Sequence, residues 1–286
     1  MGLETVRAFA NHGPLRIYLA ARTESKATAA IDALNRAFPG VDIAFLRLDL
    51  SSLASVREAA SSFCSREKKL HVLVNNAGVM ATPPGLTKDG VEIQFGTNHL
   101  GHFLLTQLLL PTILSTSHLS DVPPRIVTVS SGGHHLAPAA GLQIEGLTFP
   151  DGGALSEWQR YGQSKLANIL FTRAMAEKYP AIVSVAVHPG MVKTDLYVSA
   201  KENSSVVRHA MAGFSNVFMK TVKEGAYAQL WAATSAKEVE SGEFYVAVGR
   251  KFRGSALSRD QGLSKRLWEW SEQKVAESDG VIACSV

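Results

Sequence analysis

The sequence predicts an α/β protein with a doubly wound parallel sheet, on three observations. Apolar runs of strand length alternate with helix-length stretches along the chain, the runs are nearly continuous, and no repeat or linker interrupts them. Such runs are typical of parallel strands covered by helices on both faces. The expected strands are residues 17–21, 43–48, 72–74, 126–129, 183–187 and 244–248, and the expected helices 2–10, 24–38, 51–66, 91–114, 156–179 and 223–233.

A chain of 286 residues, 46% of them hydrophobic, could form one α/β domain with a large core or two small domains. Because no linker is visible, we expect a single domain over residues 1–286. The net charge is +4, but the basic residues are scattered, so we expect no nucleic-acid partner. Only two cysteines are present, Cys64 and Cys284, far apart and without metal-ligand spacing. No apolar run is long enough to span a membrane, and the first residues do not resemble a signal peptide. We therefore expect a cytoplasmic protein.

The expected helix 156–179 carries Tyr161 and Lys165, four residues apart and hence one turn above each other on one face. Asn168 and Thr172 continue that polar stripe, and apolar residues fall on the opposite side. We expect the apolar side to pack on the sheet and the polar stripe to face a cleft. A nearby ammonium favours phenolate and lowers the pKa of a phenol, which suits it to acid–base catalysis near neutral pH. Taken alone, however, this spacing more often means a surface Tyr and a solvated Lys.

Several polar residues follow the expected strands, at the edge where doubly wound sheets bind ligands. Arg22 follows the first strand, with Lys26 one helical turn on, and a guanidinium there suits a 2′-phosphate. The alternative for Arg22 is a solvated side chain at a helix start. Asp49 follows the second strand, where either it or Ser51 could cap the next helix.

The later strand ends are also polar or rich in turn-forming residues. Asn75-Asn76-Ala77-Gly78, Ser131 and Pro189-Gly190 with Thr194 follow three strands, and each is also compatible with an ordinary turn. Asn98 and Gly101 lie inside the helical stretch 91–114, where such residues are unfavourable, so a kink or a special role is expected. His134 and His135 have no companions at ligand spacing, which favours hydrogen-bonded loop histidines over a metal site.

Taken together and in this order, these residues resemble the short-chain dehydrogenase/reductase family. The resemblance extends from Gly2 to about Val275. The long interval between Ser131 and Tyr161, which contains residues 142–158, is similar to the retinol dehydrogenase-like and WW-domain oxidoreductase-like branch. The sequences of residues 161–168 and 267–271 resemble that branch too.

The resemblance implies a Rossmann-type fold and a role for each matched residue. Tyr161 would be the catalytic acid/base, Lys165 would lower its pKa and bind the nicotinamide ribose, Ser131 would hold the substrate oxygen, and Asn98 would keep a water in the proton relay. Arg22 would select NADP (NADPH) over NAD. The remaining cofactor-binding positions implied are Lys26, Asp49, Leu50, Asn76, Ala77, Gly78, Pro189, Gly190, Val192 and Thr194.

The implied reaction is hydride transfer between nicotinamide and a carbonyl or alcohol of a small molecule. An apolar, Met-containing segment at about 195–221 is expected to cover the substrate and suggests that it is hydrophobic. Packing of this segment on its own core explains the composition equally well. A homo-oligomer is compatible with the sequence. The alternative function is a non-catalytic or cofactor-impaired relative that acts as a binding or scaffold protein.

One family feature is expected to be missing. Members open with an apolar strand and a Gly-rich turn, whereas Gly2 stands here at the place of the last glycine of that turn. The strand would lie centrally, between the strands that end near Ala21 and Gly78, so both neighbours would lack a partner. We therefore expect a truncated product or a misassigned gene start that folds poorly and binds NADP weakly. The alternative is a natural short form in which another segment fills the gap.

Overall fold

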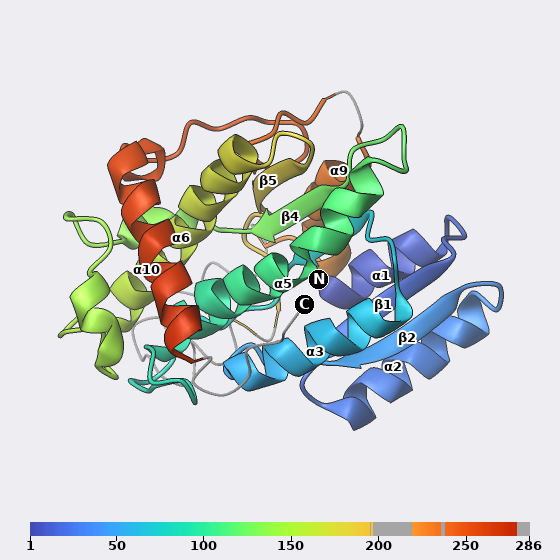
Figure 1. The fold of residues 1–286 in the computed structure, drawn as a ribbon, viewed down its shortest axis with the longest axis horizontal. Coiled ribbons are helices and arrows are strands. Elements are labelled where there is room, and N and C mark those ends of the chain that lie inside the picture. The colour runs from blue at the N-terminus through green and yellow to red at the C-terminus, as the bar shows by residue number, and fades with distance from the viewer. Residues whose placement is uncertain (195, 197–218, 236–237, 279–286) are drawn as a thin grey trace.

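The computed structural model describes residues 1–194, 196, 219–235 and 238–278, and confirms the predicted α/β fold (Figure 1). Within these residues, all strands pair in parallel. The strands are β1 (Arg16–Ala21), β2 (Asp42–Arg47), β3 (Val72–Asn75), β4 (Arg125–Val129), β5 (Val183–His188) and β6 (Phe244–Val246). Each lies within a few residues of a predicted strand.

The strands form two separate sheets. One contains β1 and β2, and the other has the order β3-β4-β5-β6. Within the described residues, β1 pairs only with β2 and β3 pairs only with β4. The carboxyl ends of the strands in each sheet lie at one edge, because parallel strands run in the same direction.

Helices cover both faces of the larger sheet. Val127 and Val129 of β4 pack with Ala228 and Ala232 of α9, whereas Ile126 packs with Leu166 on the other side. Helix α1 lies against α9 and β1, and α10 lies beside α6. The bounds are α1 (Gly2–Ala10), α2 (Glu24–Ala37), α3 (Leu53–Arg66), α4 (Ile93–Phe95), α5 (Gly101–Ser117), α6 (Glu157–Lys178), α9 (Val222–Thr234) and α10 (Gln261–Glu277).

Short polar side chains mark the helix starts. Ser156 accepts from the N–H of Gln159 at the start of α6, and Thr221 accepts from that of Glu224 at the start of α9. Helix α3 is capped by Ser52, not by either candidate proposed from the sequence. Asp49 instead accepts hydrogen bonds from the N–H and hydroxyl of Ser51. The N-cap of α3 thus lies one residue after Ser51 and three residues after Asp49.

Two helical segments differ from regular amphipathic helices. The segment between α4 and α5, η1 (Gly96–Leu100), is a π-helix, which confirms the expected irregularity around Asn98. Helix α6 is buried on every face from Arg160 to Thr172, so its polar stripe does not face open solvent. The polar stripe is covered because Lys165 and Asn168 reach the carboxyl end of β4.

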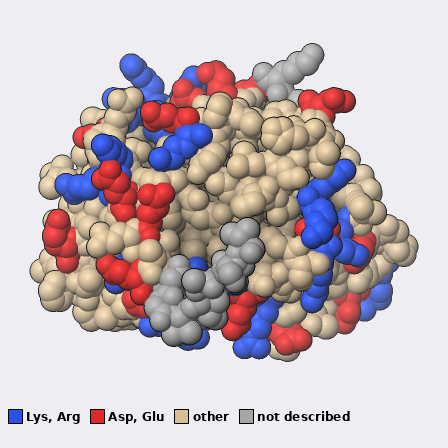
Figure 2. All heavy atoms as spheres, in the orientation of Figure 1, with Lys and Arg blue, Asp and Glu red and all other residues tan. Residues whose placement is uncertain are grey.

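The surface carries mixed charges. Figure 2 shows Lys and Arg interspersed with Asp and Glu around the visible face, with no single basic patch on it. None of the helices in the described residues is both long enough and apolar enough to cross a membrane.

Candidate active site

The π-helix directs Asn98 toward the loop that follows β3. The Oδ1 atom of Asn98 accepts from the N–H of Val79 at 2.7 Å, and its Nδ2 donates to the carbonyl of Val79 at 2.9 Å. Nδ2 also donates to the Ser164 hydroxyl on α6 at 2.9 Å. Asn98 is fully buried, and these bonds connect three segments that are distant in sequence. The amide is therefore held rigidly against the loop that contains Gly78.

Gly78 allows that loop to approach the catalytic candidates closely. A Cβ atom at Gly78 would lie 2.9 Å from Asn98 Oδ1 and 3.5 Å from Lys165 Nζ. Any larger side chain would have to displace a buried amide or an ammonium. The structure thus brings together Gly78, Asn98 and Lys165, which belong to three separate sequence motifs.

Lys165 is buried at the carboxyl end of β4. Its Nζ donates to the carbonyl of Val129 at 3.0 Å and lies 5.8 Å from the centroid of the Tyr161 ring. Asn168 Nδ2 donates to the same carbonyl at 3.2 Å. Burial lowers the pKa of Lys165 to about 8. The ammonium is therefore held close to the phenol, and the free-energy cost of burying its charge must be offset by other interactions in the fold.

Tyr161 and Ser131 meet around Gly133. A Cβ atom at Gly133 would lie 2.7 Å from Cε1 of Tyr161 and 3.4 Å from Oγ of Ser131, so glycine is needed for the ring to pack there. Ser131 Oγ accepts from the N–H of Gly133 at 3.0 Å, which leaves its own hydroxyl proton available to another acceptor. Tyr161 packs in a cluster with Met80 and Ala81.

The candidates at the β1 and β2 ends also lie together. Arg22 and Lys26 are exposed, and Arg22 is close enough to act electrostatically on Asp49. Burial raises the pKa of Asp49, but the hydrogen bonds from Ser51 and the charges of Arg22 and Lys88 outweigh it, so the pKa lies below its usual value. The carbonyl of Leu50 would be 2.5 Å from a Cβ at Gly101, which places Leu50 against the end of the π-helix.

The residues after β3 include a buried polar atom that lacks a partner. Asn76 Oδ1 has no hydrogen-bond partner within the described residues, and its Nδ2 would be 3.0 Å from a Cβ at Gly2. The amino end of α1 therefore lies beside Asn76. Ala77 is exposed.

The residues after β5 form the opposite end of the candidate site. Gly190 has φ +90°, a conformation that favours glycine. Pro189 and Val192 are buried, and Thr194 is half-buried. The backbones of Val192 and Lys220 form an isolated parallel β-bridge. Of the expected cover at 195–221, Leu196 packs against the Tyr161 cluster. Residues 195 and 197–218 lie outside the described residues.

Comparison with known proteins identifies the family. A family model for short chain dehydrogenases matches residues 1–141. The chain is 36% identical to "Short-chain dehydrogenase/reductase drtF" of Aspergillus calidoustus, an alignment that covers 98% of this chain and 91% of that protein. The chain belongs to the short-chain dehydrogenase/reductase family.

Two further similarities refine this assignment. Human "Retinol dehydrogenase 11" is 38% identical, with 95% of this chain and 81% of that protein covered, which supports the retinol-dehydrogenase-like branch. The fold is similar to the crystal structure of an NADPH-bound carbonyl reductase from chicken fatty liver. That similarity has a TM-score of 0.62 at 22% identity and covers 87% of this chain and 94% of the reductase. This short-chain dehydrogenase is accordingly an oxidoreductase with a Rossmann-type fold.

Several residues that shape this short-chain dehydrogenase site were not singled out from the sequence. Ser164 accepts from Asn98 and donates to the carbonyl of Tyr161 at 2.7 Å, and Ser130 donates to the carbonyl of Lys165 at 2.7 Å. Both serines directly precede a candidate residue, which is a weak signal.

His134 is expected from the sequence to be a hydrogen-bonded loop histidine. Its ring nitrogens contact the Ser131 carbonyl and the Ser255 N–H.

The buried Lys165 predicts an unusual dependence of stability on pH. Its pKa is about 8 in the folded protein against 10.5 for the free side chain, so the unfolded chain holds more protons between these values. The free energy of unfolding therefore rises with pH from about 8 to 10.5. Below pH 8 the buried charge costs up to about 3 kcal/mol, at 1.36 kcal/mol per pKa unit.

We expect Lys165→Met to be more stable than the wild type at pH 7, with the gain vanishing toward pH 10.5. The Val129 carbonyl keeps Asn168 as a donor in this variant. Urea denaturation across this pH range measures the difference, and Lys223→Met, which removes an exposed lysine on α9, serves as the control. A Lys165→Met protein that is less stable at pH 7, with no trend in pH, would refute the assigned cost.

Proposed function

We propose that this chain is an NADP(H)-dependent oxidoreductase that interconverts a carbonyl and an alcohol on a hydrophobic small molecule. The observation that carries the proposal is the placement of Lys165 Nζ 5.8 Å from the Tyr161 ring centroid. Both residues are buried, as is Asn98, and the half-buried Ser131 lies beside the Tyr161 ring at Gly133. Nicotinamide, when bound, supplies the hydride. The protein supplies the proton and the orientation.

In the direction of reduction, Tyr161 donates its phenolic proton to the substrate oxygen as charge develops on it. The Lys165 ammonium stabilises the phenolate that remains, because an opposite charge nearby favours the ionised form. Ser131 donates its hydroxyl proton to the same substrate oxygen, since the Gly133 N–H already occupies one of its acceptor sites. Asn98 holds the Val79 backbone and, through Ser164, the first turn after Tyr161.

The residues at this edge of the sheet fit a dinucleotide. Asn76 Oδ1 is a buried acceptor without a partner in the described residues, as a ribose hydroxyl requires. The amino end of α1 lies beside it, and helix amino ends favour phosphate groups. At the other end, Val192 and Thr194, which follow β5, are assigned the nicotinamide carboxamide. The NADPH in the chicken carbonyl reductase supports this choice of cofactor class.

A hydrophobic substrate is favoured by the surroundings of Tyr161. Its cluster contains Met80 and Ala81, with Trp158 and Leu196 packed against it. An apolar wall beside the proton donor stabilises an apolar substrate by removing its surface from water. Oxidation of NADPH in the presence of apolar aldehydes and ketones tests this function, and the absence of turnover with every member of such a panel would count against it.

Preference for NADP is assigned to Arg22. Replacing Arg22 with Asp is expected to weaken NADPH binding more than NADH binding by about 1–3 kcal/mol, the range for a charge-assisted contact to phosphate. Titration of both cofactors measures the difference, and Arg36→Asp makes the same charge change at an exposed position of α2. Equal losses for the two cofactors would remove Arg22 from the 2′-phosphate site.

The second candidate function is a cofactor-impaired relative that acts as a binding or scaffold protein. The observation that favours it is the separation of the two sheets between β1 and β3. Cofactor titration with a cooperatively folded protein discriminates the two functions. NADPH binding without turnover on any substrate would favour the scaffold.

A further inference from the structure

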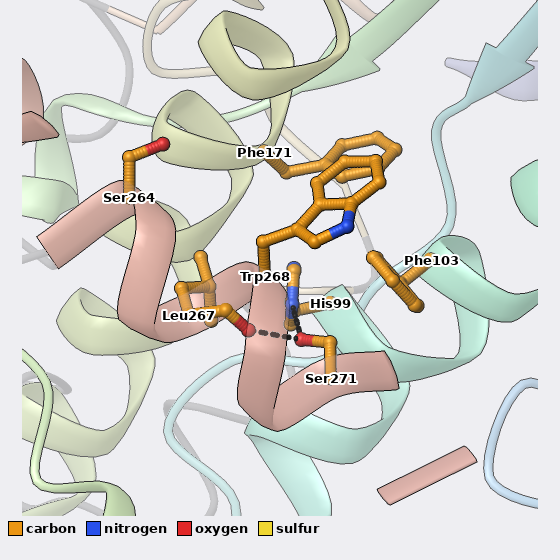
Figure 3. A pocket seen from close by; sticks show the side chains of 7 residues that line it. All are labelled: His99, Phe103, Phe171, Ser264, Leu267, Trp268 and Ser271. Atoms are coloured by element: carbon orange, nitrogen blue, oxygen red, sulfur yellow. Dashed lines mark hydrogen bonds between the residues drawn. The ribbon is translucent and has the colours of Figure 1, made fainter. Parts of the chain in front are cut away.

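The π-helix Gly96–Leu100 places consecutive side chains on opposite sides. Asn98 points to the candidate active site, where it binds Val79 and Ser164. His99 points toward Ser271 of α10, as Figure 3 shows. Single π-helical turns are rare and cost hydrogen-bond geometry, so such a turn needs support from its surroundings.

His99 is enclosed on that far side by aromatic rings. Its ring centroid is 5.2 Å from that of Phe95, 6.0 Å from that of Phe103 and 6.1 Å from that of Phe171. Burial, aided by the nearby His102, lowers the pKa of His99 to about 3. The imidazole is therefore neutral near pH 7, with one N–H donor and one acceptor nitrogen.

The donor of His99 can be assigned. Nε2 lies 2.9 Å from Oγ of Ser271 on α10, and that hydroxyl donates its proton to the carbonyl of Leu267 at 2.8 Å. Because the Ser271 proton is already used, the His99 Nε2–H must be the donor between the two side chains. Both bonds are drawn in Figure 3.

The contact between His99 and Ser271 is closed to solvent in the wild type. The gap between these side chains is too small to hold a water molecule, and Ser271 is fully buried. If the Ser271 hydroxyl were removed, the His99 N–H would lose the acceptor assigned to it here. To reach another acceptor, the imidazole would have to move, and the π-helical turn would have to move with it.

We propose that His99 is a positioning residue: its hydrogen bond to Ser271 lets α10 hold the π-helix in the register that directs Asn98 onto Val79 and Ser164. Helix α10 thereby controls the site from a position 172 residues farther along the chain. His99 contacts Ser271 of α10 and acts on the site through Asn98, the residue beside it in the π-helix. The catalytic consequence rests on the proposed function, whereas the structural link does not.

The structural link is tested on the Val79 amide, which donates to Asn98 Oδ1. In protein labelled with ¹⁵N-valine, Ser271→Ala and His99→Phe are expected to shift the Val79 amide resonance and to speed its hydrogen exchange by about tenfold or more. Ser264→Ala is the matched control, because Ser264 lies on α10 at the same junction but donates to the Leu170 carbonyl. An unchanged Val79 amide in folded Ser271→Ala protein would overturn the proposal.

The catalytic consequence is tested by non-additivity. His99→Phe is expected to lower kcat by about tenfold with little change in KM, in line with the cost of misplacing a site group. In an Asn98→Ala background, His99→Phe should lower kcat no further. A full additional loss would show that His99 does not act through Asn98. If the wild type has no turnover, the proposed function fails, while the Val79 measurement still decides the link.

Discussion

Replacing Tyr161 with Phe is expected to lower kcat for carbonyl reduction by about 10²–10⁴-fold, the usual contribution of a general acid. The variant keeps the ring that packs against Gly133 and removes only the hydroxyl. Cofactor affinity should change much less than kcat, because the lost proton transfer belongs to the transition state. Steady-state oxidation of NADPH with a responsive aldehyde or ketone measures both quantities.

Tyr179→Phe is the matched control for this experiment. Tyr179 is the C-cap of the same helix, and burial together with the nearby charge of Glu272 on α10 raises the pKa of its phenol. Its removal should leave kcat within a factor of about two, as for surface changes away from special features. A Tyr161→Phe enzyme that turns over at the wild-type rate would eliminate Tyr161 as the proton donor.

The second large effect is expected from a buried ion pair beside the site. Arg160 Nη1 lies 3.0 Å from Glu92 Oε1, and both side chains are almost fully buried. Arg160 directly precedes Tyr161 and also donates to the Thr82 carbonyl at 2.9 Å. Glu92 accepts from the N–H of Phe95, just before the π-helix. The pair therefore connects the starts of the two helical segments that carry Tyr161 and Asn98.

Arg160→Met should lower the free energy of unfolding by about 3–5 kcal/mol, because it leaves a buried carboxylate without its partner. Burial already raises the pKa of Glu92 against the opposing effect of Arg160 and nearby N–H groups. Adding Glu92→Gln should recover part of the loss, since no uncompensated charge then remains. Urea denaturation of the wild type and of the single and double variants gives the coupling free energy between Arg160 and Glu92.

The control for the ion pair is Lys274→Met, which breaks the exposed contact of Lys274 with Glu277 on α10. Exposed ion pairs contribute about 0–1 kcal/mol to stability, so this change should alter the free energy of unfolding very little. If Arg160→Met were no more destabilising than Lys274→Met, the buried pair would not support the site in the way described.

Much of the fold could be predicted because its signal is local. The alternation of apolar runs with helix-length stretches located every strand, including β6, and Asn98 with Gly101 marked the irregular helix. Parallel strands then explain why residues after separate strands, such as Arg22 and Asp49, come close together. These inferences need only periodicity and the direction of the strands.

The missed features depend on contacts between residues distant in sequence. Arg160 and Glu92 are 68 positions apart, and His99 and Ser271 are 172 apart, so no local pattern reports either pair. The sequence predicts that the polar stripe of the helix with Tyr161 faces a cleft, but not which groups cover it. That stripe is buried because the β4 carbonyl end accepts from Lys165 and Asn168. Only the packing of the sheet against α6 reveals this.

Titration of NADPH into the wild-type protein, followed by tryptophan fluorescence, tests the central claim most directly. The described site contains Trp158 beside Tyr161, so a bound cofactor should alter the emission. We expect saturable binding that is tighter for NADPH than for NADH and that persists in Tyr161→Phe. Absence of saturable binding of either cofactor to protein that unfolds cooperatively would contradict it.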